Sequence, residues 1–200
     1  MNKKKRSENM DKKELQNPAL YTNRELSWLL FNKRVLSEAR DKQLLLFERL
    51  KFLSITASNL DEFFMVRIGS LVDMIHAEYT KKDIAGMSAK EQLDALMEET
   101  HKFAALQYST YNRMLLPQLR ANGLNFVEHH EQLTERQAQY EDEYFEENVY
   151  PVLTPMAVDS SRPFPLIRNK TLNIGALVAK KGEKDTEIEF ATVQVPSVLP

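Results

Sequence analysis

The sequence predicts an α+β chain, in which an N-terminal antiparallel helical bundle is followed by the beginning of a mixed α/β domain with a β-hairpin. Over residues 26–115, apolar residues recur at steps of three and four, as on buried helix faces. After Tyr150 prolines cluster, and two β-like runs follow at residues 172–178 and 188–195. Because 42% of the residues are hydrophobic, the chain can bury a real core.

These patterns divide the chain into three parts. Residues 1–20 are expected to form a flexible, solvated tail, residues 21–125 a helical N-terminal domain, and residues 130–200 the start of a middle domain that is cut short at Pro200. The boundary is expected between about 123 and 132. Since two strands alone are marginal in water, the last part is expected to need partners that these 200 residues do not contain.

Capping patterns indicate where the first two helical segments begin and bend. Thr22 and Glu25 have the spacing of a capping box, which predicts a first helix starting there. A second helical segment is expected from about residue 44 to 79, with a kink near Ser58 and Asn59, whose side chains compete for backbone hydrogen bonds.

Similar patterns bound the third helix. Ser88 and Glu91 form another capping box, and Pro117 predicts a kink in the last turns of the helix that they open. Asn122 and Gly123 have the character of its C-terminal stop.

The remaining elements are expected at the domain boundary and beyond it. A short strand is expected at residues 124–127, and Thr134 opens a fourth helix that ends before Pro151. The segment 180–185 is expected to be the turn of the hairpin.

Charge and composition exclude several classes of protein. With 27 basic and 29 acidic residues, the chain lacks the basic excess of a dedicated nucleic-acid binder. It has no cysteine, no apolar run long enough for a transmembrane segment, and no glycine-rich phosphate loop. These features favour a cytoplasmic protein, and the basic residues of the tail leave open a peripheral contact with a membrane surface.

The most unusual segment is Ser58 to Phe64, where four polar residues interrupt a long apolar helix. The carboxamide of Asn59 offers both a donor and an acceptor, which suits the edge of a purine base. The alternative is a helix kink with solvent-facing carboxylates. Asp61 and Glu62 are adjacent, so they cannot face each other, and an ion pair of Asp61 with Arg67 or Arg49 is favoured over catalysis.

Other candidate sites have weaker patterns. Residues 128–131 contain two histidines and two glutamates, but lack the spacing of a chelating pair, so metal binding is disfavoured. Trp28 and Phe31 are expected to form a buried aromatic pair rather than a platform for a base. Arg162 and Arg168 could face an anion, or could belong to a connection shaped by its prolines.

Several motifs, in order along the chain, resemble the polyphosphate kinases of the first bacterial type. In the helical part they are the segments 23–36, 49–53 and 58–67, and in the second part the segments 151–155, 162–165, 172–174 and 195–200. The resemblance covers about residues 20–200, and the ordered set is more specific than any single motif.

The resemblance implies an enzyme that transfers the terminal phosphate of ATP to inorganic polyphosphate, reversibly, with Mg²⁺ and through a phosphorylated histidine. That histidine and the Mg²⁺ ligands are expected beyond Pro200, and neither His129 nor His130 matches it. The segment therefore contains no catalytic residue and is expected to be inactive alone. Its family role would be to hold the base of ATP or ADP, with Asn59 as the nucleotide contact.

The middle domain of the family contributes to dimerisation, which implies a homo-oligomer, a dimer or higher. A rival hypothesis is a helical assembly module with no nucleotide contact. In that case the apolar stripe over residues 46–75 would serve a partner helix.

Overall fold

The computed structural model describes residues 14–158, 164–179 and 188–197, and the chain forms two compact units that divide between Phe126 and Val127. The expected tail up to residue 13, Arg162 and the hairpin turn at residues 180–185 lie outside the described residues.

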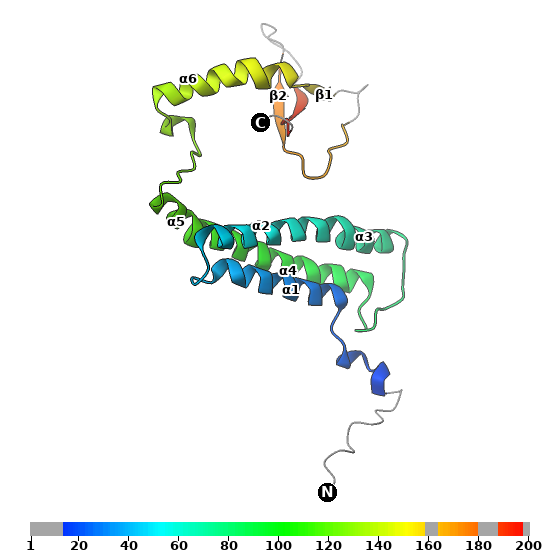
Figure 1. Ribbon diagram of the computed structural model, residues 1–200. Coiled ribbons are helices and arrows are strands. Elements are labelled where there is room, and N and C mark those ends of the chain that lie inside the picture. Colours follow the sequence, from blue (N-terminus) through cyan, green and yellow to red (C-terminus); the bar gives the residue numbers. More distant parts are fainter. Residues whose placement is uncertain (1–13, 159–163, 180–187, 198–200) are drawn as a thin grey trace. The chain divides into compact units, whose positions relative to one another are not determined.

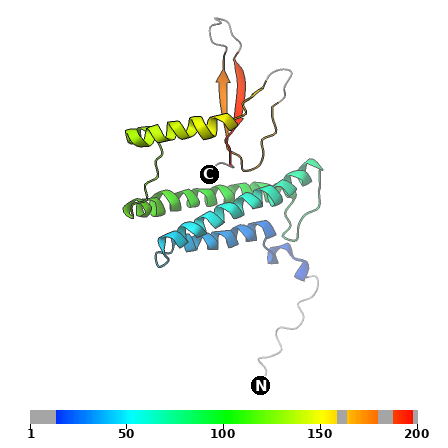
Figure 2. The same cartoon turned by 45° about the horizontal axis from the view of Figure 1, so that its top comes forward.

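The first unit is an antiparallel bundle of three helical segments, which run back and forth beside one another (Figure 1). The first segment is α1 (Arg24–Arg40), preceded by two short 3-10 turns at Glu14–Gln16 and Pro18–Leu20. The second joins α2 (Leu46–Phe63), a π-helical turn (Phe64–Ile68) and α3 (Gly69–His76). The third joins α4 (Ala89–Thr110), a π-helical turn (Tyr111–Leu115) and α5 (Leu116–Ala121). Figure 2 shows the same three segments from a second direction.

The bundle core consists of two apolar clusters, one toward each end of the helices. The first contains Leu29, Phe63, Ile68, Leu71, Ala89 and Leu96. The second contains Leu36, Ala39, Leu53, Phe103 and Leu115. Asn32 and Thr56 lie between these sets along α1 and α2, and both are fully buried. Two buried polar side chains in an apolar bundle require hydrogen-bond partners, and these partners form the candidate site described below.

The N-cap of α1 is Asn23, not Thr22 as predicted. Asn23 Oδ1 accepts hydrogen bonds from the backbone N–H groups of Glu25 and Leu26. Its Nδ2 donates to Asp83 at 2.7 Å and to Gln92 at 2.8 Å. These tertiary bonds hold the Asn23 side chain at the helix start, which explains why the helix begins one residue later than the capping-box pattern indicates.

The second segment is one continuous helical stretch, as expected, but its irregularity is not at Ser58 and Asn59. It is the π-helical turn at Phe64–Ile68. Phe63 is buried and Phe64 is exposed, and the next buried residue is Ile68. A step of five residues fits a π-turn, whose extra residue lets Phe63 and Ile68 face the same cluster.

The third segment follows the prediction closely. The Ser88–Glu91 capping box is present at the start of α4. Near the end, Pro117 has no N–H and its ring crowds the carbonyl four residues earlier, which lies inside the π-turn at Tyr111–Leu115. The helix ends at Ala121. Beyond it, Gly123 has a φ of +83°, which suits glycine, and the Leu124 N–H donates back to the Leu119 carbonyl.

The expected strand at residues 124–127 is not formed. The Leu124 amide is used in the helix-terminating bond to Leu119, and the following residues are irregular. The second unit contains a 3-10 turn (His130–Gln132), α6 (Glu135–Tyr144), a π-helical turn (Phe145–Val149) and a 3-10 turn (Tyr150–Val152). The predicted helix start at Thr134 is confirmed, and Thr134 forms a capping box with Gln137 there.

The two predicted strands form an antiparallel pair, and a third strand joins them. The strands are β1 (Met156–Val158), β2 (Asn173–Val178) and β3 (Glu189–Gln194), in the order β1-β3-β2 with Ala191 of β3 opposite both Ala157 and Ala176. β1 has only three residues and follows a proline, which explains why its pattern is not visible in the sequence. At Gly175, a Cβ would lie 2.9 Å from the Phe190 ring, so the close approach of the ring requires glycine.

Candidate nucleotide-contact site

Asn59 lies on α2 and its side chain reaches α1. Its Nδ2 donates a hydrogen bond of 3.1 Å to Oδ1 of Asn32. Asn32 is completely buried, whereas Asn59 is half-buried. The Asn59 carboxamide therefore lies at the edge of the bundle, with one side held by the interior.

The bond to Asn59 belongs to a longer polar chain. Asn32 Nδ2 donates to the backbone carbonyl of Thr56 at 3.1 Å. The Thr56 hydroxyl donates to the Leu53 carbonyl at 2.7 Å and accepts from Gln107 Nε2 on α4 at 3.0 Å. All three segments thus contribute to one hydrogen-bonded layer, and the buried polar atoms of Asn32 and Thr56 are satisfied.

The bond to Asn32 leaves the Asn59 carboxamide with one acceptor and one N–H. Within the described residues, Asn32 is the only hydrogen-bond partner of this side chain. An amide that presents an acceptor beside a donor can pair with an adenine edge, accepting from the exocyclic amino group and donating to a ring nitrogen.

Aromatic side chains beside this layer are arranged differently from the prediction. Trp28 stacks on Phe63 of α2, with ring centroids 4.5 Å apart and planes inclined by 12°. Phe31 is 48% exposed, and the Arg34 guanidinium lies 5.9 Å from its ring centroid. The predicted Trp28–Phe31 pair is wrong because Phe31 points away from the core, while Phe63, buried by the π-turn register, supplies the partner ring.

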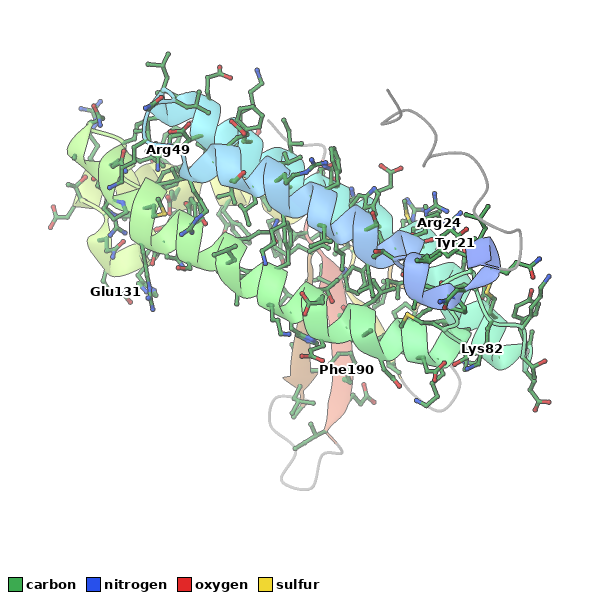
Figure 3. The ribbon with its side chains drawn as sticks, turned by 90° about the horizontal axis from the view of Figure 1, so that it is seen from below. Tyr21, Arg24, Arg49, Lys82, Glu131 and Phe190 are labelled. Atoms are coloured by element: carbon green, nitrogen blue, oxygen red, sulfur yellow. The ribbon has the colours of Figure 1, made fainter. Side chains whose placement is uncertain are left out.

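The arginines expected beside Asp61 are bound to other groups. Arg67 Nε lies 3.8 Å from Oε2 of the buried Glu25, whose other oxygen accepts from Arg24 at 2.6 Å. Arg49 is 2% exposed, and donates to the Ala39 carbonyl and to Gln118 Oε1, each at 3.1 Å. Figure 3 shows Arg49 and Arg24 at opposite ends of the bundle.

Arg49 has a structural role that its sequence context does not reveal. The Ala39 carbonyl belongs to the last turn of α1, where helix carbonyls lack partners and the helix dipole is negative. The guanidinium therefore stabilises the end of α1, and through Gln118 it also links α2 to α5. Its Nη2 is buried and has no partner among the described residues.

Among the hollows on the bundle surface, two lie between helices. One, of 290 Å³, lies between α1 and α4 and includes Leu26, Leu30, Lys33 and Lys102 in its lining. Lys102 bonds to Glu98 and Glu99 at 2.7 Å each, which raises the pKa of Lys102 and lowers that of Glu98. The other lies between α2 and α4 and is lined by groups that include Asp61, Gln107 and Tyr108.

Two kinds of feature are not found within residues 14–158, 164–179 and 188–197. No three side chains of His, Asp or Glu come together there in a way that could hold a metal ion. No helix in the described ranges is both long and apolar enough to span a membrane.

Three residues of the polar layer are absent from the sequence-based prediction: Asn32, Thr56 and Gln107. The sequence does contain a signal for Asn32. It lies three residues after the buried Leu29 and four before the buried Leu36, so it occupies the core stripe of α1. A polar residue at such a position predicts a buried hydrogen-bond partner.

Comparison with known proteins identifies the family. The polyphosphate kinase N-terminal domain matches residues 21–127, and the polyphosphate kinase middle domain matches residues 136–200. The chain therefore belongs to the polyphosphate kinase family.

Individual relatives agree with this assignment. The chain is 52% identical over 180 residues to the polyphosphate kinase of Lactiplantibacillus plantarum, covering 90% of this chain and 25% of the relative. It is 48% identical over 187 residues to that of Halalkalibacterium halodurans, covering 93% and 26%. The crystal structure of polyphosphate kinase from Porphyromonas gingivalis matches with a TM-score of 0.66 and 30% identity, covering 87% of this chain and 25% of that one. The chain thus spans about a quarter of these relatives' length.

Proposed function

We propose that this chain is the N-terminal part of a polyphosphate kinase, which reversibly transfers the terminal phosphate of ATP to inorganic polyphosphate. The membership of both matched domains in this family supports the proposal. In the proposed mechanism, a phosphorylated histidine outside these 200 residues carries the phosphate, and Mg²⁺ accompanies ATP there. The proposed role of this segment is to contact the nucleotide base and to form part of a dimer surface.

Asn59 is the residue proposed to contact the base. The observation that carries this assignment is the half-buried carboxamide with one side fixed by Asn32 and an acceptor and an N–H left over. The flanking side chains do not offer this combination: Ser58 is a short exposed hydroxyl, and Leu60 is apolar. Binding energy at the base would position ATP while the reacting phosphates are handled elsewhere.

The test is the substitution Asn59→Ala in the full-length enzyme. We expect the KM for ATP to rise about tenfold, since a bidentate amide–base contact is worth about 1–3 kcal/mol. The KM for polyphosphate should stay within about twofold, because the contact involves only the base. Ser58→Ala, at the neighbouring exposed position, is the matched control and should leave both constants unchanged. An unchanged KM for ATP in Asn59→Ala would refute the assignment.

The 200-residue chain should have no kinase activity when purified alone. The measurement is transfer of the labelled γ-phosphate of ATP to polyphosphate, with the full-length enzyme as the positive control. Transfer by the segment itself would show that its own residues perform the chemistry.

A second candidate function is assembly without nucleotide contact. The observation in its favour is the exposed apolar run Phe64, Met65 and Val66 in the π-helical turn, which a partner could cover. A crystal structure of the full-length protein with a non-hydrolysable ATP analogue separates the two candidates. A base beyond hydrogen-bond distance of Asn59 would favour assembly.

A further inference from the structure

The orientation of a carboxamide decides which base it can read, because its oxygen only accepts and its nitrogen only donates. We infer that Asn32 is a positioning residue that fixes the orientation of the Asn59 carboxamide, and thereby sets the preference of the site for a 6-amino over a 6-oxo purine. This inference rests on the proposed contact between Asn59 and the nucleotide base.

The orientation is determined by a chain of three groups. The Thr56 backbone carbonyl can only accept, so the Asn32 nitrogen must face it. The Asn32 oxygen is then turned toward Asn59, and because that oxygen can only accept, Asn59 must present its nitrogen to it. A backbone atom held in α2 therefore sets the orientation of both side-chain amides.

Burial makes this orientation costly to reverse. Asn32 has no exposed surface, so water cannot replace a lost partner. If Asn59 alone were flipped, its oxygen would face the Asn32 oxygen. If both amides were flipped, the Asn32 oxygen would face the Thr56 carbonyl oxygen. Either arrangement brings two acceptors together in the interior and leaves a buried polar group without a donor.

The fixed amide leaves Oδ1 of Asn59 as the acceptor for a ligand. Adenine presents an exocyclic amino donor at C6 beside ring-nitrogen acceptors, which matches an acceptor beside an N–H. Inosine and guanine carry a carbonyl oxygen at C6, which would meet Oδ1 as acceptor against acceptor. An amide that was free to turn could offer its N–H to that carbonyl, so the preference for the 6-amino group requires Asn32.

The experiment is Asn32→Leu in the full-length enzyme, with the KM values for ATP and for inosine triphosphate measured in parallel. We expect the KM for ATP to rise about fivefold, the size of one hydrogen bond. The KM for inosine triphosphate should stay level or fall. The KM ratio, defined as the KM for inosine triphosphate divided by the KM for ATP, should therefore shrink about fivefold or more, while kcat changes less than KM. A structural defect alone would raise both KM values together and leave the ratio constant.

Thr110→Val is the matched control. Thr110 is also fully buried in the bundle and bonds to Arg40 at 2.9 Å, but it takes no part in the chain of bonds from Asn59 to Thr56. Its KM ratio should equal that of the wild type. If Asn32→Leu does not fold, Asn32→Ala removes the same amide with a smaller side chain and carries the same comparison.

The double variant separates this inference from the proposed function. In an Asn59→Ala background, Asn32→Leu should produce no further change in the KM ratio, because Asn32 acts through Asn59. If Asn59→Ala raises the KM for ATP while Asn32→Leu leaves the ratio unchanged, the positioning role is refuted and the base contact stands. If Asn59→Ala leaves the KM for ATP unchanged, the base contact itself is refuted.

Discussion

The stacked pair of Trp28 and Phe63 gives a direct test of the bundle core, through the substitution Phe63→Leu. The Phe63 side chain is 2% exposed, and its ring lies nearly parallel to that of Trp28 at a centroid distance of 4.5 Å. Losing the ring stacking costs about 0.5–1.5 kcal/mol of stability in addition to any loss of buried area. The poorer fit of leucine in the space of the ring costs up to about 1.5 kcal/mol more. We therefore expect the free energy of unfolding to fall by about 2 kcal/mol.

Urea denaturation of the 200-residue chain, followed by tryptophan fluorescence, measures this change. Trp28 is the only tryptophan, so the signal reports on the first unit. Phe64→Leu is the matched control: it is the same substitution one residue later, on a side chain that is 36% exposed, and should cost about 0.5 kcal/mol or less. Equal losses of stability in the two variants would contradict the register of the π-helical turn, in which Phe63 faces the core and Phe64 faces outward.

Two further predictions concern polar groups of the bundle. Arg49→Met should lower the free energy of unfolding by about 1–3 kcal/mol in the same assay, because the buried Ala39 carbonyl loses its hydrogen-bond donor. An unchanged free energy would mean that removing the buried, unpartnered Nη2 offsets the loss of this bond. The other prediction concerns Glu91 of the capping box at Ser88. The pKa of its carboxyl is held below the ordinary value of 4.5, chiefly by the hydrogen bond from the Ser88 backbone N–H and then by the Ser88 hydroxyl and the charge of Lys82. The ionised carboxylate therefore stabilises the fold at neutral pH, and this contribution disappears as the pH falls through 4.5 and below the lowered pKa. Glu91→Gln should flatten this acid-side fall of the melting temperature, and an unaltered profile would contradict the role of Glu91.

Much of the bundle follows from local sequence rules. The capping box at Ser88, the helix start at Thr134 and the glycine stop at residue 123 lie where the sequence predicts them, because each depends on neighbours within a few residues. The start of α1 differs, since Asn23 is held there by Asp83 and Gln92, about sixty and seventy residues away in the sequence. Local patterns cannot contain that information.

The candidate site shows the same division. The composition of its segment marks Asn59 as unusual, and the family resemblance singles it out as the nucleotide contact. The partner of Asn59 is a residue on another helix, so its identity depends on how α1 and α2 pack. Only the position of Asn32 on an apolar stripe hints at its burial, and no periodicity in the sequence indicates that Thr56 would supply a backbone acceptor.

The π-helical turn at Phe64–Ile68 has a consequence for the history of this helix. A π-turn is equivalent to an α-helix into which one residue has been inserted without breaking the helix. Removing one residue of this turn would restore α-helical spacing and place Ile68 four residues after Phe63, so the face carrying Ile68 and Leu71 would keep its direction relative to α2. The turn therefore marks a place where this helix can differ by one residue in length without changing which residues face the core, so a single-residue deletion should be tolerated better here than in the regular part of α2.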